Sequence, residues 1–62
     1  MKTEFSIKEV MAIFNVSKRT LHYYDEIGLV VPDKNEENQY RIYRSKHLVR
    51  LQQILFYKQL GL

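Results

Sequence analysis

The chain has 62 residues, of which 45% are hydrophobic and 13% aromatic, so it is one small domain with a core and not a disordered tail. It has no cysteine, which excludes a disulfide framework, a cysteine zinc site and a thiol nucleophile. Residues 1–38 carry five basic and seven acidic side chains, whereas residues 39–62 carry five basic and no acidic ones, which indicates an anionic partner such as nucleic acid or a membrane surface.

The sequence carries no signal for export or membrane insertion. Acidic side chains interrupt the N-terminal segment, where a secretion signal needs an unbroken apolar stretch. The longest apolar runs, at 29–31 and 54–57, are far shorter than the roughly 20 residues of a membrane span. We therefore expect a cytoplasmic protein with no membrane partner.

The first helix is predicted from residue 6. Ser6 and Glu9 have the spacing of a capping box, in which both side chains accept backbone N–H groups. An apolar face then recurs at helical spacing: Ile7, Val10, Met11 and Phe14. Asn15, which tolerates left-handed backbone angles, is expected to end this helix.

Ser17 is the expected N-cap of a second helix over residues 18–27. The buried side of that helix carries Leu21, Tyr24 and Ile27. Gly28 provides the left-handed residue expected just past a helix end. Residues 6–27 thus have the pattern of two helices joined by a three-residue turn, which is a helix-turn-helix.

Two β-prone segments, residues 29–31 and 40–43, flank a polar loop and predict a small antiparallel hairpin. Strand alternation places Arg41 and Tyr43 on one face of this hairpin and Ile42 on the other. We expect Ile42 to face the core, which leaves Arg41 and Tyr43 facing outward.

A third helix is expected to begin at its N-cap, Ser45. Its inner stripe is apolar: Leu48, Leu51, Ile54 and Leu55. Phe56 and Tyr57 flank this stripe and are expected to face solvent. Gly61 has the position of a left-handed residue after the helix, with Leu62 making the apolar contact that often follows.

Three segments, in order and at the right spacing, resemble the MerR family of bacterial transcription regulators. Residues 16–29 (VSKRTLHYYDEIGL) resemble its recognition helix, and residues 38–43 (NQYRIY) resemble its wing. Residues 48–56 (LVRLQQILF) resemble its third helix, and residues 60–62 (LGL) the corner that follows. The resemblance implies a winged helix-turn-helix, a fold that is mainly α with a small β-hairpin.

The resemblance also implies boundaries and partners. One DNA-binding domain covers residues 1–62, with the helix-turn-helix at about 6–27, the wing at about 29–43 and the third helix at about 45–60, and it stops before the fourth helix and the dimerisation helix of the family. In the family, a homodimer binds a palindromic operator, and activators distort the promoter spacer so that RNA polymerase can use it. The implied partner is double-stranded DNA, with RNA polymerase engaged indirectly, no cofactor, and a monomeric state for this chain alone.

The sequence departs from the family pattern in the wing and at the start of the third helix. Gln39 stands where the wing commonly has glycine, so we expect any positive φ on Asn38 or another loop residue. Lys46 and His47 place cations in the first turn of a helix, against its dipole. We hypothesise that an approaching phosphate compensates them; the alternative is a pair of screened surface charges.

The candidate DNA contacts come from the recognition helix, the wing and the third helix. Side chains near the N-terminal end of a recognition helix read base edges, and here they are Ser17, Lys18, Arg19, Thr20, His22 and Tyr23. The resemblance assigns further contacts to Arg41 and Tyr43 of the wing and to Lys58, and Lys46 completes the set. Arg19 can hold guanine or a phosphate with two donors, and Tyr23 is expected to contact a phosphate.

A small helical protein-interaction module, whose basic face meets an acidic partner, is the alternative function. It explains the charge but not the three family motifs in register. An enzyme is disfavoured, because the sequence offers no cysteine, no histidine–acid pair at useful spacing and no glycine-rich phosphate loop. His22 and His47 are the two histidines, which are too few ligands for a metal site.

Overall fold

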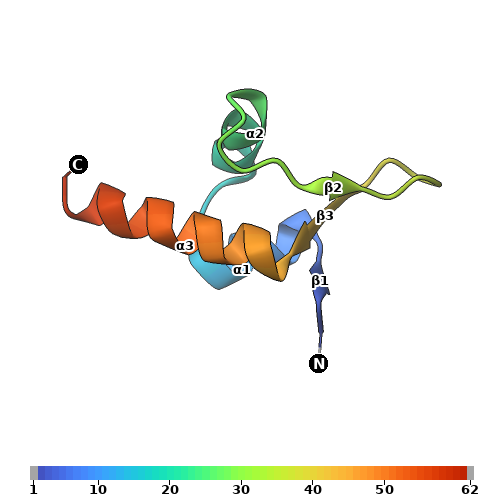
Figure 1. The fold of residues 1–62 in the computed structure, drawn as a ribbon, viewed down its shortest axis with the longest axis horizontal. Coiled ribbons are helices and arrows are strands. Elements are labelled where there is room, and N and C mark those ends of the chain that lie inside the picture. The colour runs from blue at the N-terminus through green and yellow to red at the C-terminus, as the bar shows by residue number, and fades with distance from the viewer. Residues whose placement is uncertain (1, 62) are drawn as a thin grey trace.

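The computed structural model describes residues 2–61, which form three helices and three short strands (Figure 1). In chain order these are β1 (Glu4–Phe5), α1 (Ile7–Phe14), α2 (Lys18–Glu26), β2 (Asp33–Lys34), β3 (Arg41–Arg44) and α3 (Ser45–Gln59). The C-terminal end of α3 and the tip of the β2–β3 hairpin lie at opposite ends of the molecule, and α2 stands to one side of α3. This is the expected winged helix-turn-helix.

The caps of the helix-turn-helix are those that the sequence predicts. Ser6 Oγ accepts the N–H of Glu9 at 3.2 Å, and Glu9 Oε1 accepts the N–H of Ser6 at 3.0 Å. Asn15 ends α1 with a left-handed φ of 54°. Ser17 Oγ caps α2 by accepting the N–H of Thr20 at 3.1 Å. Each of these ends is therefore fixed by a residue three or fewer positions away or by its own backbone preference.

The C-terminal end of α2 differs from the prediction in one side chain. Gly28 has the expected positive φ of 76°. Ile27, predicted on the buried side, is 53% exposed. α2 ends one residue earlier, at Glu26, so Ile27 lies on the cap and turns away from the core.

The predicted strand at residues 29–31 is wrong, and the first wing strand is β2 instead. The N–H groups of Leu29 and Val30 both donate to the carbonyl oxygen of Tyr24, at 2.8 and 3.2 Å. These donors complete the end of α2 and are not available to a sheet. Val30 is nevertheless 2% exposed, so this apolar segment packs in the core as irregular backbone.

The sheet has three antiparallel strands in the order β1-β3-β2, and β1 has no counterpart among the predicted elements. The paired residues are Glu4 with Arg44, Phe5 with Tyr43, Asp33 with Ile42, and Lys34 with Arg41. β3 is thus the central strand, with β1 covering the edge that a two-stranded wing would leave open.

The core joins all three helices to β3. Its buried hydrophobic residues are Val10, Leu21, Tyr24, Val30, Tyr43 and Leu51. The predicted inner stripe of α3 packs here, with Leu51 fully buried and Leu48, Ile54 and Leu55 partly buried against it. Tyr43 is 0% exposed, so the prediction that it faces outward is wrong. The alternation in β3 is real, but its phase follows the larger aromatic side chain and leaves Ile42 only partly buried.

The turn of the wing is closed by Asn35 and by a non-glycine residue in a left-handed conformation. Asn35 Oδ1 accepts the N–H of Glu37 at 2.8 Å, and the Asn35 N–H donates to the carbonyl of Tyr40 at 2.9 Å. The positive φ falls on Gln39 itself, at 62°, so the prediction that it would fall on Asn38 or another loop residue is wrong. Gln39 therefore has a left-handed backbone conformation that glycine adopts readily and that is strained for a residue with a side chain.

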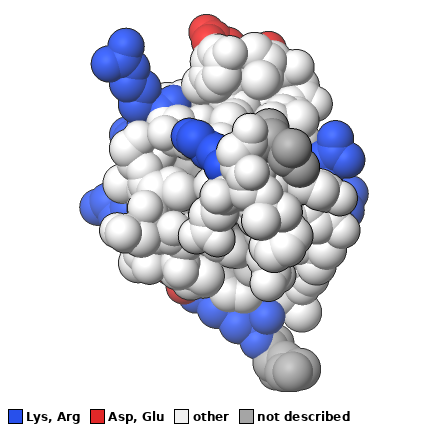
Figure 2. Space-filling model, turned by 90° about the vertical axis from the view of Figure 1, so that its left-hand side faces the viewer, with Lys and Arg blue, Asp and Glu red and all other residues white. Residues whose placement is uncertain are grey.

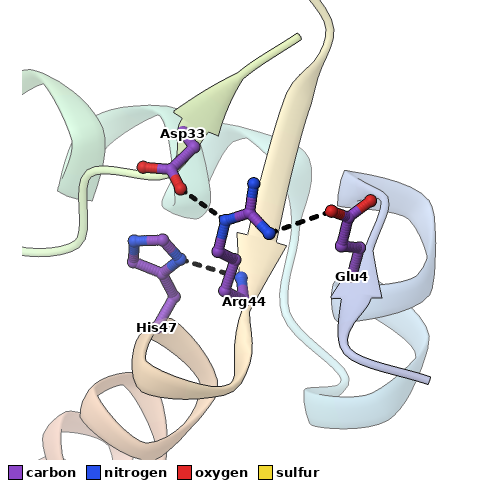
Figure 3. Close-up of polar contacts among 4 residues, drawn as sticks. All are labelled: Glu4, Asp33, Arg44 and His47. Carbon is purple, nitrogen blue, oxygen red and sulfur yellow. Dashed lines mark hydrogen bonds and ion pairs between the residues drawn. The ribbon is translucent and has the colours of Figure 1, made fainter. Parts of the chain in front are cut away.

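A single arginine links the three strands (Figure 3). Arg44 Nε donates to Asp33 Oδ2 of β2 at 2.6 Å, and Arg44 Nη1 donates to Glu4 Oε2 of β1 at 2.9 Å. The guanidinium lowers the pKa of the Asp33 carboxyl, and the two carboxylates raise the pKa of Arg44. Because these side chains are about half exposed, we infer that their ion pairs align the three strands more than they stabilise the fold.

The start of α3 is also capped differently from the prediction. The N-cap is Arg44, whose backbone N–H donates to His47 Nδ1 at 2.8 Å (Figure 3). Ser45 is the first helical residue and does not act as the cap. His47 is 8% exposed, and its burial lowers its pKa, an effect that the charges of Lys46 and Arg44 reinforce and that of Asp33 opposes. His47 is therefore a neutral cap and not the phosphate-facing cation of the hypothesis.

The C-terminal end of α3 agrees with the prediction. Gly61 follows the helix with a φ of 78°, and the proposed contact of Leu62 lies outside the described residues. Phe56 and Tyr57 are 58% and 56% exposed. The end of α3 thus presents aromatic side chains to solvent.

Candidate nucleic-acid interface

The first turn of α2 presents two cations to solvent. Lys18 and Arg19 are exposed and form no ion pair within residues 2–61. Ser17 and Thr20 instead bind each other through their hydroxyl groups at 2.9 Å, next to the backbone cap. The hydroxyl pair fixes the start of the helix, and the two cations project from it.

An open hollow of about 490 Å³ lies between α2 and the wing. Its lining residues are Arg19, His22, Tyr23, Asp25, Glu26 and Arg41. The structure therefore brings together four of the predicted DNA contacts, three from α2 and one from β3. Tyr23 is 55% exposed, as expected for a side chain that meets a partner, whereas its neighbour Tyr24 is in the core.

His22, which lines this hollow, has one buried polar atom. Its Nε2 is shielded from solvent and has no hydrogen-bond partner within residues 2–61. An unpaired buried polar atom costs free energy, so such atoms commonly have a function or an additional partner. The Nε2 atom is thus unpaired within the described part of the chain but not accessible, so a contact of this atom with a partner requires the His22 ring to turn outward.

Arg41 is anchored to α2 by an acidic residue that was not among the predicted site residues. Arg41 Nε donates to Asp25 Oδ2 at 2.9 Å, and the two side chains are 32% and 19% exposed. The signal in the sequence was an acid within a cationic recognition helix, but its partner lies 16 positions away. The wing therefore meets α2 through an ion pair at the edge of the hollow.

Tyr43 does not belong to this surface. Its ring is buried and packs edge-on against His47, with ring centroids 6.1 Å apart. Burial raises the pKa of its hydroxyl, and that hydroxyl has no hydrogen-bond partner within residues 2–61. The side chain is inaccessible to a DNA backbone, so we remove it from the candidate interface.

The two lysines predicted on α3 lie apart from each other. Lys46 is exposed in the first turn, beside a second hollow of about 330 Å³ under the loop at residues 28–31. Lys58 is exposed in the last turn, at the end of the molecule opposite the hairpin tip (Figure 1). Neither lysine lines the hollow between α2 and β3.

Charge alone does not mark a binding face on the side where α3 ends. Figure 2 shows Lys and Arg side chains scattered singly on that side, mostly near its margin, with a largely uncharged surface between them. Within residues 2–61, no cluster of acidic or histidine side chains could hold a metal ion, and no helix has the length and apolar character of a membrane span. The hollow beside α2 is therefore the candidate site.

A capped helix-turn-helix, a second helix with exposed cations and a hairpin beside it define the class of winged helix-turn-helix DNA-binding domains. Within that class, the sequence profile described as "MerR HTH family regulatory protein" matches residues 5–62. The chain belongs to the MerR family.

Known relatives agree with this assignment. The chain is 47% identical over 57 residues to the HTH-type transcriptional activator TipA of Streptomyces coelicolor, a match that covers 92% of this chain and 22% of TipA. It superposes with a TM-score of 0.87 and 46% identity on the N-terminal part of Mta, the Bacillus subtilis multidrug transporter activator, over 94% of this chain and 55% of that structure. It also matches a chain in the cryo-EM structure of an EcmrR–DNA complex, with a TM-score of 0.81 and 42% identity over 94% of this chain and 22% of that one. The chain thus spans about a fifth of the curated relative TipA.

Proposed function

We propose that this chain binds double-stranded DNA sequence-specifically, as the DNA-binding part of a bacterial transcription regulator, and that it acts by binding and not by catalysis. In this proposal α2 enters the major groove, and the β2–β3 hairpin lies on the flanking backbone or minor groove. The observation that supports it is the hollow that gathers Arg19, His22, Tyr23 and Arg41 between the second helix and the wing.

The proposed contacts divide into base readers and phosphate binders. Arg19 reads base edges, because it is exposed, cationic and free of ion pairs within residues 2–61. The phosphate-binding set is Lys18, Tyr23 and Arg41, with Ser17, Thr20 and His22 as further polar contacts from α2 and with Lys46 and Lys58 as outer cations from α3. Phosphate contacts position the domain, and the base reader gives it sequence preference.

Duplex binding at several salt concentrations tests the proposal. Neutralising phosphates makes log affinity fall linearly with log salt. With a duplex selected by the wild-type chain from a random pool, Arg19→Ala should cost about 1–3 kcal/mol and relax the sequence preference. Arg41→Ala should weaken selected and unselected duplexes alike and reduce the salt slope by about 1.

Lys2→Ala is the matched control, because it also removes one cation but lies just before β1, which Figure 1 shows on the other side of the molecule from α2. It should leave sequence preference unchanged. A wild-type chain that selects no sequence and binds without salt dependence would contradict DNA binding and favour the protein-interaction module.

We also propose that the full regulator acts in the bacterial cytoplasm as a homodimer on a palindromic operator or promoter spacer, and affects RNA polymerase through the DNA. Two copies of a weak DNA-binding domain, when joined, gain affinity through effective concentration. Fusing the chain to a parallel dimerising coiled coil should therefore raise affinity for a palindromic duplex by about 10²–10⁴-fold over a half-site. Equal affinity of the fusion for both duplexes would contradict the dimer proposal.

A further inference from the structure

An acidic side chain lies on the proposed DNA-binding surface, where it carries the wrong charge for the partner. Asp25, in the last turn of α2, lines the hollow together with Arg19 and Tyr23. A carboxylate close to DNA phosphates is repelled by them, so its presence weakens binding unless it has a compensating role. The contact that it makes identifies that role.

The Asp25–Arg41 pair joins the recognition helix to the wing. Within residues 2–61, the bond of 2.9 Å from Arg41 Nε to Asp25 Oδ2 is the one side-chain hydrogen bond between α2 and the β2–β3 hairpin. Arg41 is the first residue of β3, paired with Lys34 at the end of β2 nearest the turn. The pair therefore holds the outer end of the wing, whereas Arg44 aligns its inner end.

The geometry of Arg41 leaves its phosphate-binding atoms free. A guanidinium has five N–H donors in a rigid planar fork, and only Nε is used by Asp25. Its Nη atoms make no hydrogen bond within residues 2–61. A fork that is already oriented loses less side-chain entropy when it binds a phosphate.

We propose that Asp25 is a positioning residue for DNA binding: its carboxylate holds Arg41 and the start of β3 beside α2, so that the Nη atoms of Arg41 meet a backbone phosphate. This inference rests on the proposed function of the same surface. It predicts that an acid on the binding face strengthens the binding of an anion.

Whether DNA affinity falls or rises when the Asp25 carboxylate is removed separates a positioning role from simple charge repulsion. Glu26 lines the same hollow, is exposed and forms no ion pair within residues 2–61, so it is the matched control. Glu26→Ala should leave affinity for a mixed-sequence duplex unchanged or raise it, because it only removes a repulsive charge. Asp25→Ala removes the same charge but should weaken binding about 3–10-fold, the cost of ordering one long side chain.

Two further variants test the contact itself. Asp25→Asn keeps a carbonyl oxygen that can accept from Arg41 Nε and should bind at least as tightly as wild type. Arg41→Lys keeps the charge but has no fork that can contact both Asp25 and a phosphate, so it should weaken binding as much as Asp25→Ala. Asp25→Ala should also lower the salt slope by about 1, which a loss of stability alone would not do.

The measurements are fluorescence anisotropy of a labelled mixed-sequence duplex across salt concentrations, with circular dichroism to confirm that each variant is folded. Tighter binding by Asp25→Ala, or wild-type affinity for Arg41→Lys, overturns the positioning role. If Asp25→Ala does not fold, Asp25→Asn and Arg41→Lys decide the question. If wild type itself shows no salt-dependent binding, the proposed function fails, a result that is distinct from any of these.

Discussion

The helix-turn-helix and the wing reach their conformations by different means. In the helix-turn-helix, Ser6 bonds Glu9 and Ser17 bonds Thr20, each three positions away. In the wing, Arg44 reaches Asp33 across 11 positions and Glu4 across 40. The first region is specified by local sequence, and the second by contacts that exist only once the rest of the chain has folded.

The largest effect is expected at the point where the wing enters the core. Tyr43→Ala should lower the free energy of unfolding by about 3–5 kcal/mol, because it empties a fully buried site. Since a small domain has little stability to lose, this variant should be largely unfolded, as circular dichroism and urea denaturation would reveal.

Tyr43→Phe is the control that separates packing from contact with DNA. The hydroxyl of Tyr43 has no hydrogen-bond partner within residues 2–61, so removing it should leave DNA affinity nearly unchanged and should leave stability unchanged or slightly higher. A folded Tyr43→Phe variant that lost DNA affinity would restore the original assignment of Tyr43 to the interface.

In the helix-turn-helix, the loss of a single cap should lower the stability of the domain. Ser6→Ala removes the hydroxyl that accepts the Glu9 N–H and should cost about 1 kcal/mol in urea denaturation. Ser45→Ala is the matched substitution at the start of α3, directly after the wing, where the serine is helical but does not cap the helix. It should change stability by less than about 0.5 kcal/mol. Equal losses from the two variants would mean that Ser45 caps α3 after all.

This contrast also explains which parts of the fold the sequence predicts. Ser6, Asn15 and Ser17 were predictable because their reasons lie within one helical turn. Residues 29–31 were β-prone, yet the N–H groups of Leu29 and Val30 both donate to the carbonyl of Tyr24 at the end of α2. Propensity could not reveal this, because it depends on how tightly the chain turns after Gly28.

The candidate site divides in the same way. The exposed cations Lys18 and Arg19 follow from their places in α2 and were predictable from helical spacing. Asp25 was missed because its importance depends on Arg41, 16 positions away in another element. Tyr43 was misplaced because alternation fixes which residues share a face of a strand but not which face is buried.

A glycine in the wing turn should make that region more stable. Gln39 has a φ of 62°, a left-handed conformation that strains most side chains by about 1–2 kcal/mol. Gln39→Gly relieves this strain but adds freedom to the unfolded chain, so we expect a net gain of about 0.5–1 kcal/mol, seen as a higher melting temperature.

Asn15→Gly is the comparison in the helix-turn-helix, because Asn15 has a similar φ of 54°. Asparagine tolerates this conformation better than glutamine, so the gain there should be close to zero. A larger gain at Asn15 than at Gln39 would contradict the view that the wing turn is the strained one.

The smallest effect is expected in the pH dependence of stability, through the cap of α3. Burial lowers the pKa of His47 below its ordinary value of 6.5, and the charges of Arg44 and Lys46 add to this while Asp33 opposes it. The unfolded chain then binds more protons than the folded one, so the free energy of unfolding falls as pH drops through about 6.5 toward the lower folded pKa. Protonation would also remove the lone pair of Nδ1 that accepts the Arg44 N–H.

His47→Gln keeps an acceptor at this capping position and cannot titrate, so its urea midpoint should change less between about pH 7 and 5. At lower pH both proteins should lose stability alike, because the pKa of Asp33 is lowered by Arg44 in each. An equal slope for both proteins between pH 7 and 5 would show that the titration of His47 does not cause the loss of stability over this range.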